Sequence, residues 1–325
     1  MTKKILTIAV AIFLSNAVIS QSGKQNTASY DICIYGATSS GVIAAYTAAR
    51  CGNSVVLIEP GKMIGGLTTG GLGKTDSGIK EAITGLSLQF YQRVAQKYGS
   101  TGEQWTFEPR IALEVMEDFI REGGVNVLMQ TQLIGVEKQG AVIRSVRLHD
   151  QNTKKKMTIH AKQFLDCTYE GDLLAKAGVS YFIGREDNSV YKETLNGFQL
   201  PEYHKQSGYH QFPDGVSPYK IPGDTRSGLL WGISKNKTQA SGKGDRKVQA
   251  YNSRICLTDS AENRIPITRP EGYDASRYEL LIRLIEAQPT MRGINDYFIW
   301  SMMPNRKTDI NNRGGFSTDM IYMNQ

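Results

Sequence analysis

Histidine and cysteine are both scarce in this sequence of 325 residues, with four of each. The histidines form no cluster with Cys or Asp at ligand spacing, which argues against a metal site. No C-x-x-C motif occurs, which argues against a dithiol oxidoreductase. Four cysteines permit two disulfides with three possible pairings, but Cys33 and Cys167 lie in apolar strand-like runs, where we expect buried thiols.

A concentrated charge of either sign is also lacking. The formal net charge is +7, from 38 basic and 31 acidic residues, and the basic residues are scattered. The one run, three lysines at 154–156, lies between two strand-like segments. It is therefore predicted to be a solvated hairpin tip rather than a nucleic-acid patch, and no nucleic-acid partner is expected.

The apolar run near the N-terminus is too short to span a membrane. It covers residues 5–14, about half of the ~20 residues that a spanning helix needs. Lys3 and Lys4 precede it, and Val18 and Ser20 are suitable cleavage positions. Residues 1–20 are therefore predicted to be a signal peptide of a periplasmic or extracellular protein without a permanent membrane anchor.

Glycine is abundant by contrast, with 33 residues, in a chain of ordinary globular composition. "YDICIY" and "SVVLIE" are typical of buried strands, and "GVIAAYTAAR" between them is typical of a helix with Gly52 as its C-cap. Strand, helix and strand within about 30 residues predict a βαβ unit and a parallel sheet. Helices are then predicted in "GLSLQFYQRVAQKYG" and in "EPRIALEVMEDFIREGG", which stops at Gly123 and Gly124.

From Val125 the pattern changes to short strands separated by turns. These strands predict a meander that returns to the parallel sheet at "QFLDCT". Past Gly184 the periodicity weakens, and "SRYELLIRLIEAQ" is the one clear helix. The predicted fold is α/β: a Rossmann-like domain with a parallel sheet and a β-meander at 29–184, and a partial, loop-rich α+β domain at 185–325.

The turn after the first strand is nearly a dinucleotide-binding fingerprint. Gly36 and Gly41 occupy the first and third glycine positions, but Thr38 stands at the second. Glu59 ends the second strand, where a carboxylate can accept hydrogen bonds from ribose hydroxyls and would repel a 2′-phosphate. NAD and FAD therefore fit better than NADP.

Four dispersed motifs together carry a family resemblance. "YGATSSGVIAAYTAAR", "VVLIEP", "IGGLTTGGLG" and "FLDCTYEGDLLAKAGVSYFIGRE" resemble the secreted FAD-dependent oxidoreductases of the bacterial FAD_oxidored group, which are related to the glutathione-reductase-type flavoprotein fold. The resemblance runs from about Tyr30 to the end of the chain. It implies FAD as cofactor and a small organic or carbohydrate-related substrate, oxidised by hydride transfer to flavin, with an unidentified electron acceptor.

The resemblance also implies FAD-binding positions, carried over residue by residue. They are Gly36, Thr38, Ser39, Ser40 and Gly41 in the first turn, Glu59 and Pro60 after the second strand, Gly65, Gly66, Leu67 and Thr68 in the glycine-rich stretch, and Leu133, Thr168 and Tyr169 further along. The turn and the glycine-rich stretch would adjoin the pyrophosphate, Glu59 the ribose, and the Leu133 backbone the adenine. At the position where the family has Ala-Thr-Gly, this chain has Cys167-Thr168-Tyr169. Tyr169 therefore replaces the glycine.

No residue stands out as the base that a hydride donor needs. Equivalent candidates are Asp76, Arg185, His204, His210 and Arg254. Asp172, just ahead of an apolar helical run, is equally typical of a helix N-cap.

The C-terminal stretch lacks the late Gly-Asp turn of this fold, which indicates a truncated chain. Two alternatives therefore remain beside the flavoenzyme: a catalytically inactive flavoprotein remnant, and an NAD-dependent dehydrogenase. The sequence does not define the oligomeric state.

Overall fold

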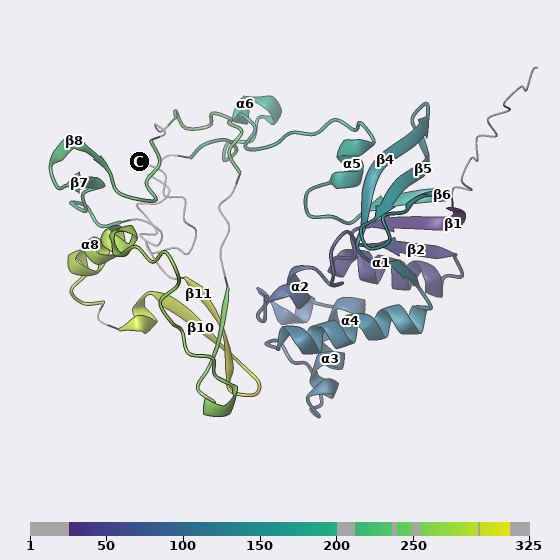
Figure 1. The fold of residues 1–325 in the computed structure, drawn as a ribbon, viewed down its shortest axis with the longest axis horizontal. Coiled ribbons are helices and arrows are strands. Elements are labelled where there is room, and N and C mark those ends of the chain that lie inside the picture. Colours follow the sequence, from purple (N-terminus) through teal and green to yellow (C-terminus); the bar gives the residue numbers. More distant parts are fainter. Residues whose placement is uncertain (1–25, 200–211, 236–238, 249–253, 292, 313–325) are drawn as a thin grey trace, which may run out of the picture.

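A computed structural model describes residues 26–199, 212–235, 239–248, 254–291 and 293–312. Figure 1 shows two regions side by side, which we call the first region (residues 26–178) and the second region (residues 179–312). Among the described residues, no helix combines the length and the apolar character needed to cross a bilayer. The predicted signal peptide lies outside the described residues.

A six-stranded sheet is the centre of the first region. Its order is β3-β2-β1-β6-β5-β4. The strands are β1 (Asn26–Tyr35), β2 (Val55–Ile58), β3 (Asn126–Leu128), β4 (Thr131–Gln139), β5 (Val142–Asp150) and β6 (Lys156–Asp166). The pairs β1–β2, β2–β3 and β1–β6 are parallel, while β4, β5 and β6 pair antiparallel. The predicted parallel sheet with a returning meander is therefore confirmed.

Successive side chains of a strand point to opposite faces of a sheet. Here each face carries its own apolar cluster. Ile34 and Leu57 face the helices α1 (Ser39–Arg50) and α4 (Pro109–Gly123) in one apolar cluster. Cys33 and Val56 belong to a second cluster on the other face, which Leu173 of α5 (Asp172–Lys176) completes. The remaining helices of this region are α2 (Leu67–Gly70), η1 (Lys80–Ala82) and α3 (Gly85–Lys97).

The ends of the helices follow local sequence signals. Pro109 opens α4, and Gly124 ends it in the left-handed conformation at φ 60°, which glycine adopts without a steric penalty. The predicted cap of α1 was one residue off, since Cys51 is the C-cap and Gly52 follows it at φ 84°. Gly171 rather than Asp172 is the N-cap of α5, so the N-cap interpretation of Asp172 was wrong.

The second region consists of short elements and long connections, as its sequence predicts. It contains α6 (Asn188–Tyr191), β7 (Tyr219–Ile221), β8 (Asp224–Leu229), β9 (Ile255–Thr258), η2 (Ala261–Asn263), η3 (Ala275–Tyr278), α8 (Glu279–Ala287), η4 (Ile294–Asp296), β10 (Phe298–Met303) and β11 (Lys307–Asn312). The predicted helix is confirmed as α8. Strand β11 pairs with β10 and β9 in a three-stranded antiparallel sheet.

Candidate functional site

The turn between β1 and α1 requires glycine at two positions. Gly36 has φ 96°, and a Cβ there would lie 2.7 Å from the backbone of Cys167 at the end of β6. A Cβ on Gly41 would overlap the carbonyl oxygen of Gly36. The two glycines therefore let the turn, the start of α1 and the end of β6 approach one another closely.

Thr38 does not need to be glycine, because its φ of −64° and ψ of 177° suit any residue. As the N-cap of α1, its hydroxyl accepts a long hydrogen bond of 3.5 Å from the Gly41 N–H. The same hydroxyl donates to the Cys167 carbonyl at 2.7 Å. The threonine thus fastens the start of α1 to the end of β6, and the missing glycine does not disrupt the fingerprint turn.

The N-terminus of α1 is a suitable site for a phosphate group. The helix has 12 residues and no acidic residue in its first turn, so the helix itself places no negative charge at its positive end. The hydroxyl of Ser39 donates at 2.8 Å to the Gly65 carbonyl and lies 2.8 Å from the hydroxyl of Thr68. Ser40 is exposed beside it.

Glu59 lies next to this turn at the end of β2. One oxygen of its carboxylate accepts from the Ala37 N–H at 2.8 Å, and the other accepts from the Gly61 N–H at 2.6 Å. The side chain is half-buried. Because each carboxylate oxygen has a second lone pair, ribose hydroxyls can still bind here. Pro60 follows, and its carbonyl accepts from the Gln151 side chain.

The glycine-rich stretch begins against the same turn. Gly65 and Gly66 have φ values of 90° and 57°, and the Gly65 N–H donates to the Ala37 carbonyl at 2.6 Å. Two predicted stretches that are 24 residues or more apart are therefore in direct contact. We call the turn, the start of α1, Glu59 and residues 65–68 the cradle.

The three remaining predicted residues lie around the cradle with their polar groups engaged. The hydroxyl of Tyr169 accepts from the Leu67 N–H at 2.7 Å, and its ring fills the space beside Gly66. Thr168 donates through its N–H and its hydroxyl to Asp166. Leu133 is buried, and its N–H donates to the hydroxyl of Tyr35 at 3.0 Å. Their contacts with FAD stay a prediction.

A cavity of about 670 Å³ continues from the cradle along α1. Ser39, Ser40 and Thr68 form its cradle end, while Thr75 and Tyr91, joined by a 2.7 Å hydrogen bond, lie in its wall. Sequence reasoning did not identify Thr75 or Tyr91. The small residues on one face of α1, Ala44 and Ala48, were the available signal.

The cradle residues fit the ADP half of a dinucleotide. A carboxylate for the ribose, an unopposed helix N-terminus for the pyrophosphate and the glycines that permit close approach lie together in one place. The adjoining cavity lies within the size range of ligand sites, so it offers room for a further group.

The candidate bases are not gathered at the cradle. Arg185 forms an ion pair with Asp245, and Arg254 binds both carboxylate oxygens of Asp309. Asp76 is exposed. His204 and His210 lie outside the described residues. Within the described ranges, no group of three His, Cys, Asp or Glu side chains could hold a metal ion, and the four cysteines are free thiols.

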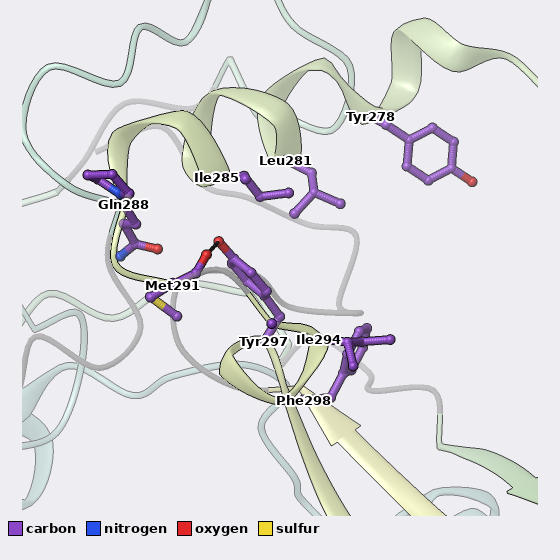
Figure 2. Close-up of a pocket in the computed structure, with 10 residues that line it drawn as sticks. Tyr278, Leu281, Ile285, Gln288, Met291, Ile294, Tyr297 and Phe298 are labelled. Carbon is purple, nitrogen blue, oxygen red and sulfur yellow. Dashed lines mark hydrogen bonds between the residues drawn. The ribbon is translucent and has the colours of Figure 1, made fainter.

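A second cavity, of about 750 Å³, lies in the second region (Figure 2). Leu281 and Ile285 of α8 face Tyr297 across it, and the Tyr297 hydroxyl donates to the Met291 carbonyl at 3.1 Å. Burial raises the pKa of Tyr297, so this phenol stays protonated at neutral pH. The lining is mainly apolar and supplies no carboxylate or imidazole.

One family model matches most of the chain. It is the model of the FAD dependent oxidoreductase family, and it matches residues 31–325. No curated protein matches the sequence.

Several solved structures are similar to parts of the chain. A geranylgeranyl bacteriochlorophyll reductase-like protein from Thermoplasma acidophilum is 17% identical over 48% of this chain and 43% of that one, with a TM-score of 0.35. A glycerol-3-phosphate dehydrogenase from Bacillus halodurans complexed with FAD is 17% identical over 53% and 42%, with a TM-score of 0.36. A flavoprotein/dehydrogenase from Cytophaga hutchinsonii is 18% identical over 48% and 44%, with a TM-score of 0.35. The matched part spans less than half the length of each of these proteins.

Proposed function

Because this chain belongs to the FAD dependent oxidoreductase family, we propose that it oxidises a small organic or carbohydrate-related substrate by hydride transfer to FAD, the cofactor of that family. We further propose that the protein is exported and passes electrons to a separate acceptor. The observation that supports FAD binding by this chain is the cradle, where Glu59, the start of α1 and residues 65–68 converge.

Each part of the cradle has a definite task in this proposal. Glu59 accepts hydrogen bonds from the ribose hydroxyls, and its charge keeps a 2′-phosphate out. The first amides of α1, with the exposed hydroxyl of Ser40, hold the pyrophosphate, and Ser39 keeps residues 65–68 beside it through its hydrogen bond to Gly65. The isoalloxazine supplies the redox chemistry when FAD is bound, and the residues around it supply position and electrostatics.

Visible absorption of the chain purified from Gln21 onward tests the proposal. A flavin spectrum is expected, with FAD released on denaturation, and titration of the stripped protein with FAD should restore the spectrum. Glu59→Gln removes the charge that faces the ribose and should weaken FAD binding about tenfold or more, as expected for a charged hydrogen bond. Glu81→Gln, at an exposed position, is the matched control.

The alternatives give different results in the same experiment. Tight NAD binding by a protein that does not bind FAD would contradict the proposal in favour of a dehydrogenase. FAD binding without bleaching by any small alcohol, amine or sugar would contradict the proposed substrate oxidation and favour an inactive flavoprotein.

A further inference from the structure

The glycine-rich segment comprises residues 65–74. Its near end, residues 65–68, is part of the cradle. Gly65 donates to the Ala37 carbonyl and accepts from the Ser39 hydroxyl, and Thr68 lies against the same serine. This end of the segment is therefore fixed by the first region alone.

The loosest part of the segment is Gly70 and Gly71, because buried Thr69 and the Tyr169 hydroxyl hold the α2 turn before them. A Cβ on Gly70 or Gly71 would meet no atom within 4 Å, and Gly71 has a φ of 139° that side chains rarely adopt. Leu67 is 59% exposed. Glycines with no packing partner have large conformational freedom, so the path from Gly70 to Lys74 depends on what fixes its two ends.

The far end of the segment is held from both regions. In the first region the Phe107 N–H donates to the Gly73 carbonyl at 2.9 Å, and the second region adds contacts to Gly73 and Lys74. The Lys74 N–H donates to Oδ2 of Asp309 in β11 at 3.0 Å, and Met303 of β10 lies against Gly73. Asp309 is 1% exposed and is itself held by Arg254 through hydrogen bonds of 2.8 and 2.9 Å. In Figure 1 the β10–β11 hairpin is the part of the second region on the side of α2 and α3.

A second contact between the regions holds the turn of the β10–β11 hairpin against α4. Glu108, 3% exposed and at the N-cap of α4, accepts hydrogen bonds from Asn305 and Lys307 at the hairpin turn and from the Tyr98 hydroxyl. Each region thus presents a buried carboxylate to donors of the other. Contacts of this kind depend strongly on geometry, because a displaced donor leaves a buried charge unpaired.

The position of the segment matters because of where a dinucleotide would extend. Glu59 and the cradle account for the ADP half, and the cavity along α1 leads from Ser39 and Thr68 to Thr75. Thr75 directly follows Lys74, so the hydrogen bond to Asp309 sets this wall of the cavity together with the bond between Thr75 and Tyr91.

We propose that Asp309 is a positioning residue for the part of FAD beyond the pyrophosphate: from the second region it fixes the far end of the glycine-rich segment, while the ADP half depends on the first region alone. The inference rests on the proposed function, which supplies FAD as the ligand. The cradle residues bind, and Asp309 acts through the segment without touching the cofactor.

Comparison of FAD with ADP separates this role from a general loss of structure. In Asp309→Asn the new amide group faces N–H donors, so the Kd for FAD should rise about tenfold while the Kd for ADP changes less than twofold. Lys74→Pro removes the N–H donor and leaves the Asp309–Arg254 pair intact, so it should have the same effect. Lys74→Ala keeps that N–H and changes only an exposed side chain, so it should resemble the wild type. Equal weakening of both ligands, or no weakening of FAD, would overturn the proposal.

Amide hydrogen exchange of the ligand-free proteins gives an independent readout. In Asp309→Asn and Lys74→Pro, amides of residues 70–76 should exchange faster, while those of β1 and β2 keep their wild-type protection. Unchanged exchange at 70–76 would refute the anchoring. If the wild type binds neither FAD nor ADP but this difference appears, the anchoring holds and the proposed function fails.

Discussion

The two regions are held together by different kinds of interaction. Of the twelve largest fully buried side chains among the described residues, eleven lie in the first region, and Leu284 alone lies in the second. Both apolar clusters also belong to the first region. Because apolar burial is the dominant favourable term in folding, the first region has its own source of stability.

The second region has less apolar burial, and side chains with a charge connect several of its segments. Arg185 pairs with Asp245, and Arg283 donates to the carbonyls of Ser217, Tyr219 and Lys220. Its surface exposes large apolar side chains, with Ile265 at 89% and Ile267 at 83%. Geometry-dependent polar contacts without a large core make this region the more easily deformed of the two, which suits a part that contacts a loop next to a cofactor.

The largest expected effect comes from the core of the first region. Phe119 is fully buried, with its ring 5.0 Å from that of Tyr46 and 4.1 Å from the guanidinium of Arg93. Phe119→Ala should lower the free energy of unfolding by about 3–5 kcal/mol in urea denaturation. Glu117→Ala, exposed on the same helix, should change it by less than about 0.5 kcal/mol. An equal cost for Leu284→Ala would break the comparison, because it would show a comparable core in the second region.

The next effect concerns the contact between the regions and is pH-dependent. Burial alone raises the pKa of Glu108, but hydrogen bonds from Lys307 and Asn305 outweigh it, so the pKa lies below its ordinary value of 4.5. The titratable groups that face Glu108 are Lys307 across this contact and Tyr98 within the first region, whose pKa burial raises to about 12. A lowered pKa stabilises the fold above pH 4.5, and this contribution is lost as the pH falls through the folded value.

The protection of amides at the β10–β11 turn, corrected for the slower intrinsic exchange in acid, should therefore fall on acidification below pH 4.5 in the wild type. Glu108→Gln should already lose about 1–3 kcal/mol at neutral pH, because Lys307 loses its charged partner, and its turn should show a weaker pH dependence. The same acid response in both proteins would assign the effect to other carboxylates.

Much of the first region could be predicted because its signals are local. Continuous apolar, β-branched runs in β1 and β2, the proline and glycine at the ends of α4, and the spacing of Gly36 and Gly41 each act over a few residues. The sheet of the second region could not be predicted, because β9 pairs with β11 across about 50 residues and both strands are short.

The site shows the same division. The cradle residues were identified because glycine at positive φ and an acid at the end of a strand leave marks in the sequence. Asp309 and Glu108 were not identified, since a carboxylate in a strand or before a helix gives no sign of a partner some 200 residues away. Arg254 was considered only as a catalytic candidate, whereas the structure pairs it with Asp309.

A smaller effect tests how far the second region depends on its ion pairs. Asp245 accepts from Arg185 and from the Lys247 N–H, and Gly184 lies against the backbone of the same residue. Because the Arg185 side chain is about a third exposed, Asp245→Asn should cost only about 1–2 kcal/mol. Faster amide exchange confined to residues 184–198 and 242–247 is expected. A change that spreads into β1 would show that the regions unfold as one unit.

The smallest effect concerns Tyr169, at the boundary of the cradle. Its hydroxyl accepts from the Leu67 N–H, but the side chain is 62% exposed, so water can replace the lost bond in Tyr169→Phe. The free energy of unfolding should fall by about 0.5–1 kcal/mol or less. FAD titration of the same variant gives the sharper result. Unchanged affinity would show that this hydroxyl only holds α2, whereas tighter binding would show that it competes with the cofactor for the Leu67 N–H.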